Sequence, residues 1–259
     1  MSIPVLMYHA IGSGSSSTQQ YDDADFVVSE NNFKAQLSYL KDNGFSSCRL
    51  DDVPSLLLAT NRKVIISFDD GHASDVSIAL PLLQEYGFSA EFFFTSNWIG
   101  QEGYVDEEGI RALHSAGMGI GSHGVTHQFF NDFSFSAAED ELVRSTESLS
   151  NIISAPVDRF SAPGGRLPDE LEKLMALCGI KYVCTSEIDT CNSNNFPLEV
   201  PRIAIRNDTS IELFEKIVNA DAAYYRRHQV RKSALVLLRT VLGNQRYMNM
   251  REKLLQLRP

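Results

Sequence analysis

Several features common in other protein classes are missing from this chain of 259 residues. No run of 18 apolar residues occurs, which argues against a membrane-spanning helix. The first residues, MSIPVLMYHAIG, contain no basic region, and their apolar run is too short for a signal peptide. The four cysteines show neither C-x-x-C nor zinc-finger spacing. We therefore expect a cytoplasmic protein with reduced thiols.

Positive charge is scarce over most of the chain. The formal net charge is −10 at pH 7, which argues against nucleic acid as a partner. Residues 224–259 are the exception, because they contain nine Lys or Arg and one Asp or Glu. We therefore divide the chain into an acidic body, residues 1–223, and a basic helical tail, residues 224–259.

The basic tail contains Leu and Val at roughly helical spacing among its cations. Two interpretations stay open. The tail either packs on the acidic body as an ordinary helix or lies on an anionic membrane surface as a peripheral contact. The second interpretation would place the protein at the inner face of the membrane. The sequence leaves the oligomeric state open.

The body alternates short β-rich runs with helical segments. Phe33, Leu37 and Leu40, for example, share one helix face, with Asn31 or Asn32 as the expected cap. This order is typical of parallel strands covered by helices. The sequence thus predicts an α/β fold, a distorted (β/α) barrel of seven or eight parallel strands, with a doubly wound open sheet as the alternative. The expected strands are Ile3–Tyr8, Phe45–Leu50, Lys63–Phe68, Ala90–Thr95, Met118–Ser122, Arg159–Ala162, Tyr182–Thr185 and Val200–Ile205.

Polar residues collect where the expected strands end. In a (β/α) barrel the carboxyl ends of all strands share one face, where active sites are built. We therefore expect these side chains to converge on one place. They are His9 after the first strand, Asp69 and Asp70 after the third, His123 after the fifth, and Pro163 and Gly164 after the sixth.

Two histidines four residues apart, His123 and His127, stand in the segment SHGVTH. That spacing can bring both rings to one ion. Two histidines and a carboxylate make a three-ligand site with open positions for water. This is the donor set of catalytic zinc or a similar divalent ion such as Co, Ni or Mn.

The adjacent carboxylates of Asp69 and Asp70 stand in the segment SFDDG. Successive residues of a strand point to opposite faces, so both can reach one site only where the strand has ended and the chain turns. Gly71 permits such a turn. One carboxylate can then bind a metal while the other takes a proton from water.

These segments together resemble the polysaccharide deacetylases, the NodB-homology domain of carbohydrate esterase family four, over about residues 3–210. The flanking phrases ALPLLQEYGFSAEFFFTSNWIG and GMGIGSHGVTH resemble that family too. The resemblance implies a barrel that uses a divalent metal, most often zinc, to remove acetyl groups from an N-acetylated amino sugar. The substrate class would be a polysaccharide, an oligosaccharide or a lipid-linked glycan. It also implies that Asp69 is the catalytic base and that Asp70, His123 and His127 are the metal ligands.

The chain departs from the family pattern in its third motif, FSAPGGR. Ser161 stands where the family has an Arg that steadies the base. Arg166 or Arg202 is expected to supply that charge instead. Pro163 and Gly164 keep the rest of the motif, and together with His72 they are expected to support the site or to bind substrate.

The family's late catalytic histidine is also missing, because only His228, in the basic tail, follows His127. His9 ends the first strand much as the missing motif would end the last one. First and last strands are neighbours in a closed barrel, so the site would survive moving that strand to the start of the chain. Some deacetylases of exported polysaccharides look permuted in this way. We therefore predict that His9 is the catalytic acid and points into the metal cleft.

Two other functions remain as alternatives. A related C–N hydrolase of the same fold, allantoinase-like or acting on a cyclic imide, often lacks the complete ligand set, which this chain has. A non-catalytic sugar-binding protein would explain the missing Arg and the missing late His, but not the retained base. The sequence does not identify the sugar, its linkage or the native metal.

Overall fold

The structure, a computed structural model, places the chain in two units by its contacts, Met1–Asn219 and Ala220–Pro259. In the second unit, residues 222–230 form a helix. The predicted membrane contact of the basic tail falls mostly outside the described residues and stays a prediction. The structure describes all residues except 1, 13–23, 57–61, 193–195, 197–198 and 231–259.

Strands and helices alternate along the first unit, as the sequence predicts. The strands are β1 (Val5–Tyr8), β2 (Ala10–Ile11), β3 (Val27–Val28), β4 (Ser46–Ser47), β5 (Lys63–Phe68), β6 (Glu91–Phe94), β7 (Gly119–Ser122), β8 (Arg159–Ser161), β9 (Tyr182–Cys184) and β10 (Ile203–Ala204). The helices are α1 (Glu30–Asp42), α2 (Val53–Leu56), α3 (Leu80–Tyr86), α4 (Glu107–Ser115), α5 (Phe135–Ile153), α6 (Leu171–Cys178) and α7 (Ile211–Val218). A π-helical turn, η3 (Asp75–Ala79), leads into α3, and a 3-10 turn, η6 (Pro163–Gly165), follows β8.

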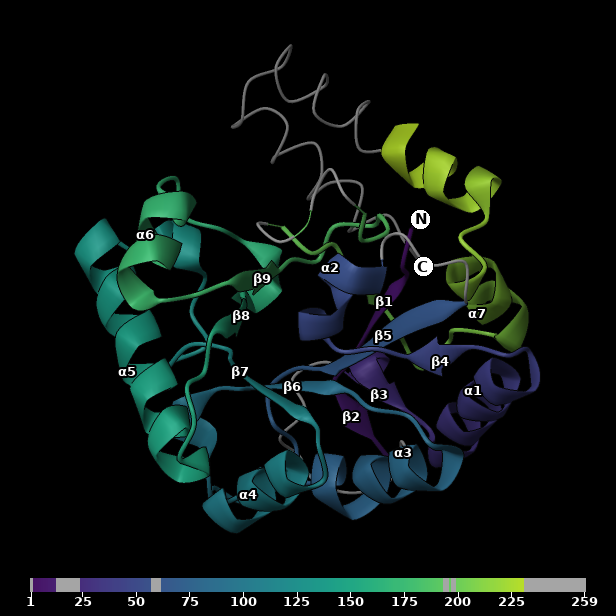
Figure 1. Cartoon of the computed structure of the whole chain (residues 1–259), viewed down its shortest axis with the longest axis horizontal. Helices are drawn as coiled ribbons and strands as arrows, with labels where there is room; N and C mark the ends of the chain where they lie inside the picture. The colour runs from purple at the N-terminus through teal and green to yellow at the C-terminus, as the bar shows by residue number, and fades with distance from the viewer. Residues whose placement is uncertain (1, 13–23, 57–61, 193–195, 197–198, 231–259) are drawn as a thin grey trace. The chain divides into compact units, whose positions relative to one another are not determined.

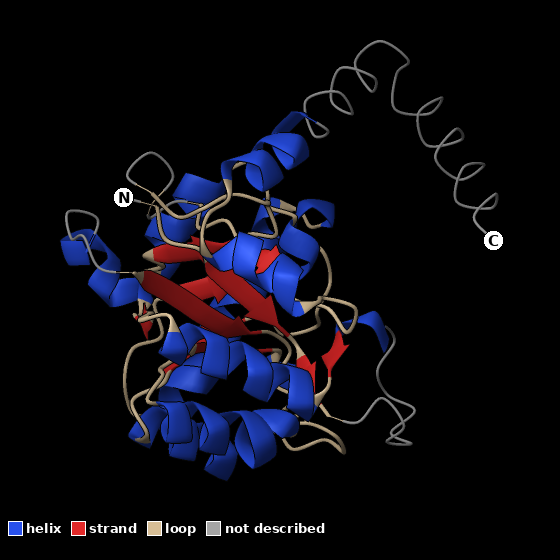
Figure 2. Cartoon of the chain, turned by 90° about the vertical axis from the view of Figure 1, so that its right-hand side faces the viewer, coloured by secondary structure: helices blue, strands red, loops and turns tan. Residues whose placement is uncertain are grey.

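The main sheet has the strand order β10-β1-β5-β6-β7-β8-β9, and every pair in it is parallel. Strand β4 joins it beside β5. A parallel bridge between Cys184 and Val200 links the end of β9 to the segment before β10. The seven strands curl into a half-barrel with helices outside it (Figures 1 and 2). The predicted α/β fold with a barrel-like sheet is therefore confirmed, in preference to the alternative of a doubly wound open sheet.

The first strand of the chain lies beside the last one. In β1, Leu6 pairs with Ile203 of β10, while the other edge of β1 pairs along its whole length with β5. The carboxyl ends of β1, β5 and β10 therefore lie next to one another. This is the arrangement that a permuted barrel requires.

The helices form for the reasons that their sequences suggest, with one correction. Phe33, Leu37 and Leu40 form the buried face of α1, as predicted. The predicted cap, Asn31 or Asn32, is wrong because both residues are already inside the helix. Ser29 is the cap, and its hydroxyl accepts a hydrogen bond from the backbone N–H of Asn32.

Aromatic side chains of neighbouring strands pack against one another in the sheet. Phe68 of β5 stacks on Phe92 of β6, with ring centroids 4.8 Å apart, and Tyr8 of β1 stacks on Phe68 at 5.3 Å. Burial of each such ring contributes about 1.5–3 kcal/mol. A one-residue slip of β1, β5 or β6 would move these rings to the opposite face of the sheet, so the packing fixes the register of these strands.

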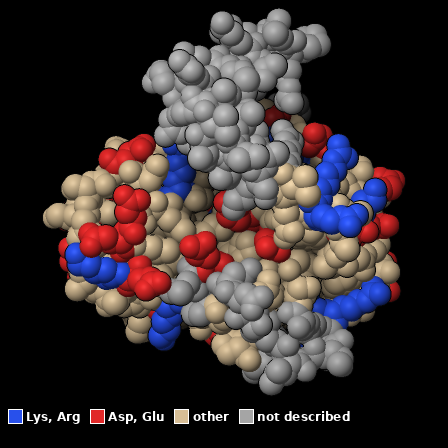
Figure 3. Space-filling view, turned by 90° about the horizontal axis from the view of Figure 1, so that it is seen from above, with Lys and Arg blue, Asp and Glu red and all other residues tan. Residues whose placement is uncertain are grey.

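Charged side chains of both signs are mixed on one face of the described residues. On the face shown in Figure 3, Lys and Arg lie among Asp and Glu and do not gather into one basic field. Pairs one helical turn apart, such as Lys34–Glu30 and Arg144–Asp140, account for part of this mixture. In the part of the chain that the structure describes, no helix is both long and apolar enough to cross a bilayer.

Candidate active site

The site begins at the turn that follows β5. The backbone N–H of Asp69 still donates to the carbonyl of Tyr8 at 3.0 Å, which extends the pairing of β1 and β5 by one bond. Asp70 and Gly71 then adopt φ values of 77° and 83°. A Cβ on Gly71 would lie 2.5 Å from a ring carbon of Phe94, so only glycine fits there. The turn brings two neighbouring carboxylates to one place, as the sequence predicts.

The predicted ligands Asp70, His123 and His127 lie together. Each offers one ligand atom, and these three atoms lie within 4.8 Å of one another. The Nε2 atoms of His123 and His127 are 3.4 and 3.2 Å from Oδ1 of Asp70. His123 follows β7, and His127 is held in the left-handed region at φ 61°. Two of the three predicted ligands, Asp70 and His127, thus have a backbone conformation that non-glycine residues rarely adopt.

The donors fit a divalent ion. Oδ1 of Asp70 is buried and makes no hydrogen bond of good geometry within the described residues. Nδ1 of His123 lies 2.7 Å from the carbonyl of Ser161, so this nitrogen carries the proton and Nε2 keeps its lone pair. Burial lowers the pKa of His123 to about 4, against the charges of Asp69 and Asp70, so its imidazole is neutral at pH 7. Two imidazoles and a carboxylate are a donor set that suits zinc.

His72 lies beside the same carboxylate. Its Nε2 is 3.5 Å from Oδ2 of Asp70, and its ring stacks on Tyr104 with centroids 5.3 Å apart. Burial would raise the pKa of Asp70, but the imidazoles of His127 and His72 hold it well below its usual value. Asp70 is therefore ionised, as a metal ligand must be.

The second carboxylate, Asp69, forms a buried pair with Arg202. The two terminal nitrogens of Arg202 donate to the two oxygens of Asp69, both at 2.7 Å. Ser161 donates to Oδ2 of Asp69 at 3.1 Å and accepts from Arg202 at 2.7 Å. The Nε of Arg202 donates to the carbonyl of Thr185 at 3.0 Å. Arg202 is fully buried, so these bonds fix the guanidinium in one position.

This pair keeps Asp69 ionised. Burial by itself would raise the pKa of Asp69, but the charge and the hydrogen bonds of Arg202 hold it below its usual value. Of the two arginines proposed from the sequence, Arg202 contacts Asp69. Arg166 instead lies over the ring of Phe129, with its guanidinium carbon 4.0 Å from the centroid.

Pro163 and Gly164 shape the turn η6 after β8. Pro163 is buried, and Gly164 has a φ of 61°. A Cβ on Gly164 would lie 2.7 Å from the ring of Phe129, the ring that Arg166 covers. These residues thus form a compact turn soon after Ser161, and the side-chain hydrogen bonds described for Asp69 come from Ser161 and Arg202 instead.

His9 follows β1 and is partly exposed. Its ring lies 4.5 Å from that of Phe26, and its Nδ1 atom is buried without a hydrogen-bond partner in the described part of the chain. Burial lowers the pKa of His9, the charges of Asp70 and Asp69 oppose this, and Arg202 adds to it. The charges of both carboxylates thus act on His9, and its role as the catalytic acid stays a prediction.

The sequence analysis did not predict two features of the site. Ser161, noted only as the place of a missing Arg, bridges Asp69, Arg202 and His123. Trp98 packs its ring 4.9 Å from that of His127 and 4.9 Å from that of Tyr104, which makes an aromatic wall beside the predicted ligands. The loop that contains Trp98 and Tyr104 reaches the site because its backbone pairs with the turn after β5. Sequence periodicity does not predict such a pairing between two loops.

The comparisons agree with this geometry. Residues 59–183 match the profile of the family described as polysaccharide deacetylase. YxkH of Bacillus subtilis, provisionally named a polysaccharide deacetylase, is 29% identical over 190 residues, which cover 71% of this chain and 64% of that protein. The match thus leaves more than a third of YxkH without a counterpart.

Solved structures show the same fold. The Streptococcus pyogenes deacetylase PplD, in complex with acetate, is 24% identical with a TM-score of 0.76, over 84% of this chain and 98% of that one. The polysaccharide deacetylase-like protein BA0330 of Bacillus anthracis is 25% identical with a TM-score of 0.75, over 84% and 69%. IcaB of Ammonifex degensii is 19% identical with a TM-score of 0.72, over 84% and 97%. The chain is thus similar in sequence to the polysaccharide deacetylases over residues 59–183 and has the fold of the solved deacetylases, as its motifs predict.

Proposed function

We propose that this protein is a metal-dependent hydrolase that removes acetyl groups from N-acetylated amino sugars in a polysaccharide, an oligosaccharide or a lipid-linked glycan. One observation carries the proposal. A buried, ionised carboxylate, Asp69, lies next to a three-donor set of Asp70, His123 and His127. A base beside a metal-type site is what hydrolysis of an unactivated amide needs.

In this proposal Asp70, His123 and His127 hold the ion, with zinc favoured and Co, Ni or Mn as other choices. A divalent ion bound there would polarise the acetamide carbonyl and lower the pKa of a water molecule. His123 is prepared for the role because its Nδ1–H donates to the carbonyl of Ser161 and leaves Nε2 free to bind.

Asp69 is the proposed general base. Water attacks the acetyl carbon, Asp69 takes its proton, the C–N bond breaks, and acetate and a free amine result. Arg202 supports this role in two ways. It keeps Asp69 ionised, and its two bonds at 2.7 Å hold the carboxylate in one orientation.

His9 is the proposed acid. An amine leaves as a neutral group only when its nitrogen receives a proton as the C–N bond breaks. The lowered pKa of His9 makes its imidazolium a stronger acid, while Asp70 and Asp69 favour that charged form. The unpartnered Nδ1 atom leaves a ring nitrogen available for this transfer.

The place of action is part of the proposal. We propose that the protein works in the cytoplasm at the inner face of the membrane, where the cations of residues 224–259 would hold it near a lipid-linked glycan. The support is the charge of this segment in the sequence.

The test is acetate release across a panel of N-acetylglucosamine oligomers, N-acetylated sugar nucleotides and lipid-linked sugars. The wild-type protein loaded with zinc should release acetate from at least one class of substrate. Acetate release by Asp69→Asn should be about 10²–10⁴-fold slower, which is the usual contribution of general-base catalysis. Ring opening of a cyclic amide with no acetate release would favour the related C–N hydrolase. Glycan binding without turnover would favour a non-catalytic protein.

A further inference from the structure

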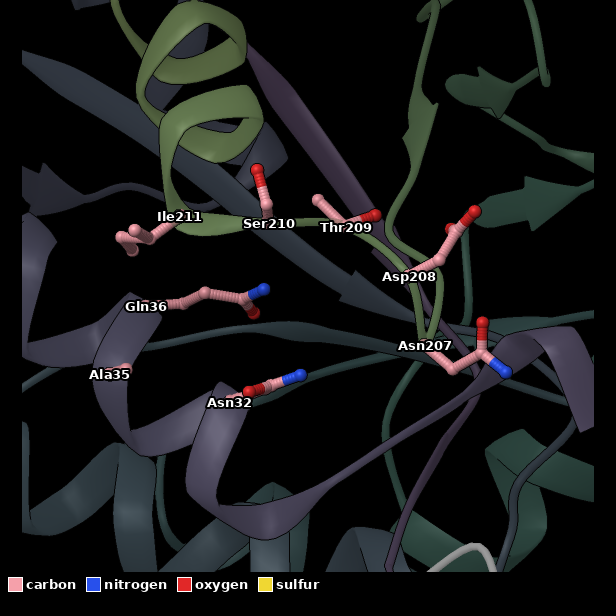
Figure 4. A pocket seen from close by; sticks show the side chains of 8 residues that line it. All are labelled: Asn32, Ala35, Gln36, Asn207, Asp208, Thr209, Ser210 and Ile211. Carbon is pink, nitrogen blue, oxygen red and sulfur yellow. The ribbon is translucent and has the colours of Figure 1, made fainter.

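Polar side chains outside the candidate site gather at two places. One is a cavity between α1 and the segment 207–211, in which Asn207 and Asp208 point away from Gln36 (Figure 4). None of the residues that line this cavity is a predicted site residue. The other place is the contact between α5 and the loop 124–126. This loop joins two predicted metal ligands, so the contact bears directly on the metal site.

A carboxylate of α5 holds the loop between His123 and His127. Glu141 is 7% exposed and lies on the buried face of this helix. Its Oε2 atom accepts hydrogen bonds from the backbone N–H groups of Val125 and Thr126, at 2.8 and 3.0 Å. Its Oε1 atom accepts one from the hydroxyl of Thr126 at 3.0 Å. One side chain thus makes three bonds to two of the three residues that separate the histidines.

The start of the loop is held from the next turn of the same helix. The hydroxyls of Ser145 and Ser122 share a hydrogen bond, and the Ser122 hydroxyl also accepts from the backbone N–H of Gly124 at 3.0 Å. Gly124 has a φ of 81°, and a Cβ there would lie 3.4 Å from Oε2 of Glu141 and 3.2 Å from the ring of Phe130. Glycine therefore allows the loop to lie this close to the helix.

The surroundings of Glu141 are those of an anchor for the backbone. Buried carboxylates are usually paired with a cation. The hydrogen-bond partners described for Glu141 are instead two backbone N–H groups and one hydroxyl. Hydrogen bonds to an ionised acceptor are roughly twice as strong as bonds between neutral groups. The loop is therefore held more firmly than one whose backbone contacts only water.

The position of His127 depends on this anchor. The ring of His123 is fixed by the bond between its Nδ1 and the carbonyl of Ser161. His127 comes directly after Thr126, its side chain is 33% exposed, and its backbone is in the left-handed region at φ 61°. A non-glycine residue keeps that conformation only where its surroundings impose it. The three bonds of Glu141 impose it from the preceding residues.

We propose that Glu141 is a positioning residue for the metal site, because its carboxylate keeps His127 beside Asp70 before an ion binds. The inference rests on the proposed function for the presence of the metal. Without these bonds, the free energy of metal binding would first have to order the loop. Groups that orient metal ligands typically change metal affinity about 10–100-fold. The loss of Glu141 should therefore appear in the affinity for zinc.

The test is the zinc Kd of chelator-stripped, full-length protein, measured by competition with a chromophoric chelator and with folding checked by circular dichroism. Glu141→Leu removes all three bonds and should raise the Kd about 10–100-fold. Glu141→Gln keeps an acceptor for both N–H groups and can donate to the hydroxyl of Thr126, so its Kd should stay close to that of the wild type. Glu147→Leu, at an exposed position of the same helix, is the matched control and should leave the Kd unchanged.

A merely structural role would lower the free energy of unfolding in Glu141→Leu and leave the Kd of the folded protein unchanged, and that result would overturn the proposal. A Glu141→Gln protein as weak as Glu141→Leu would also overturn it, because charge and not position would then set the affinity. If Glu141→Leu does not fold, Thr126→Val removes only the bond to Oε1 and should raise the Kd by a smaller factor, so an unchanged Kd there counts against the proposal. Absence of zinc binding by the wild type would overturn the proposed function together with this inference, whereas wild-type binding with an equal Kd in Glu141→Leu would overturn this inference alone.

Discussion

The pair between Asp69 and Arg202 gives the sharpest prediction. Arg202→Met removes a fully buried guanidinium that makes two bonds of 2.7 Å to Asp69 and leaves that carboxylate buried beside Ser161 alone. Breaking a buried ion pair by removing one partner costs about 3–5 kcal/mol. We therefore expect the free energy of unfolding of the metal-free protein at pH 7 to fall by about that amount.

The pH dependence follows from the sign of the shift. In the wild type the pKa of Asp69 is below its unfolded value because Arg202 outweighs burial, so the pair stabilises the fold at neutral pH and this stability is lost as the pH falls through the folded pKa. Arg202→Met removes the largest cause that opposes burial, so the pKa of Asp69 rises. The stability gap between the two proteins should therefore be widest at neutral pH and narrow in acid. The acid limb of kcat/KM should move to higher pH, because the base is ionised only at higher pH.

The assays are urea unfolding of metal-free protein at pH 7 and pH 4.5, and the pH profile of acetate release. Arg166→Met is the matched control, since Arg166 lies over Phe129 and does not contact Asp69. It should cost about 0.5–1 kcal/mol and leave the acid limb in place. If Arg202→Met does not fold, Arg202→Lys keeps the charge and should show a smaller shift in the same direction. An Arg202→Met protein with wild-type stability and an unmoved acid limb would refute the argument.

Three further predictions concern the metal site, His9 and the tail. The double variant His123→Ala/His127→Ala should lose bound metal and activity together, and full stoichiometric metal by atomic absorption would contradict the ligand set. His9→Ala should keep the metal but lose about 10²–10⁴-fold in kcat, the usual range for general acid catalysis, whereas loss of metal would make His9 a ligand. Truncation after Ala223 should leave a folded, metal-binding body with weaker, salt-sensitive binding to anionic vesicles, at about 1 kcal/mol per cation near the surface. Equal vesicle binding by both lengths at low salt would remove the tail from membrane contact.

The sequence predicts the strands well where polar residues bound them. The strand Lys63–Phe68 is found with its predicted ends, because Lys63 is polar and the DDG turn stops the strand. The remaining strands are found a few residues shorter than predicted. The cap of α1 was missed because Ser29, Asn31 and Asn32 can all cap a helix, and only the backbone decides among them.

Local sequence patterns are not sufficient to predict which side chains meet in the site. Arg166 is five residues from Ser161, whereas Arg202 reaches Asp69 only because Val200 pairs with the end of β9 and β10 pairs with β1. The aromatic wall of Trp98 and Tyr104 likewise depends on backbone bonds between two loops. By contrast, the strand-end argument located Asp69, Asp70, His123 and His127 together, because parallel strands bring their carboxyl ends to one edge.

The most direct measurement of the central claim is zinc titration of chelator-stripped protein, with acetate release from the N-acetylglucosamine pentamer as the signal. The account predicts almost no release without metal, a rise that levels off at one zinc per chain, and a flat response in Asp70→Ala, which lacks one of the three donors. Full acetate release by the stripped wild-type protein, or an Asp70→Ala protein that responds to zinc as the wild type does, would contradict it.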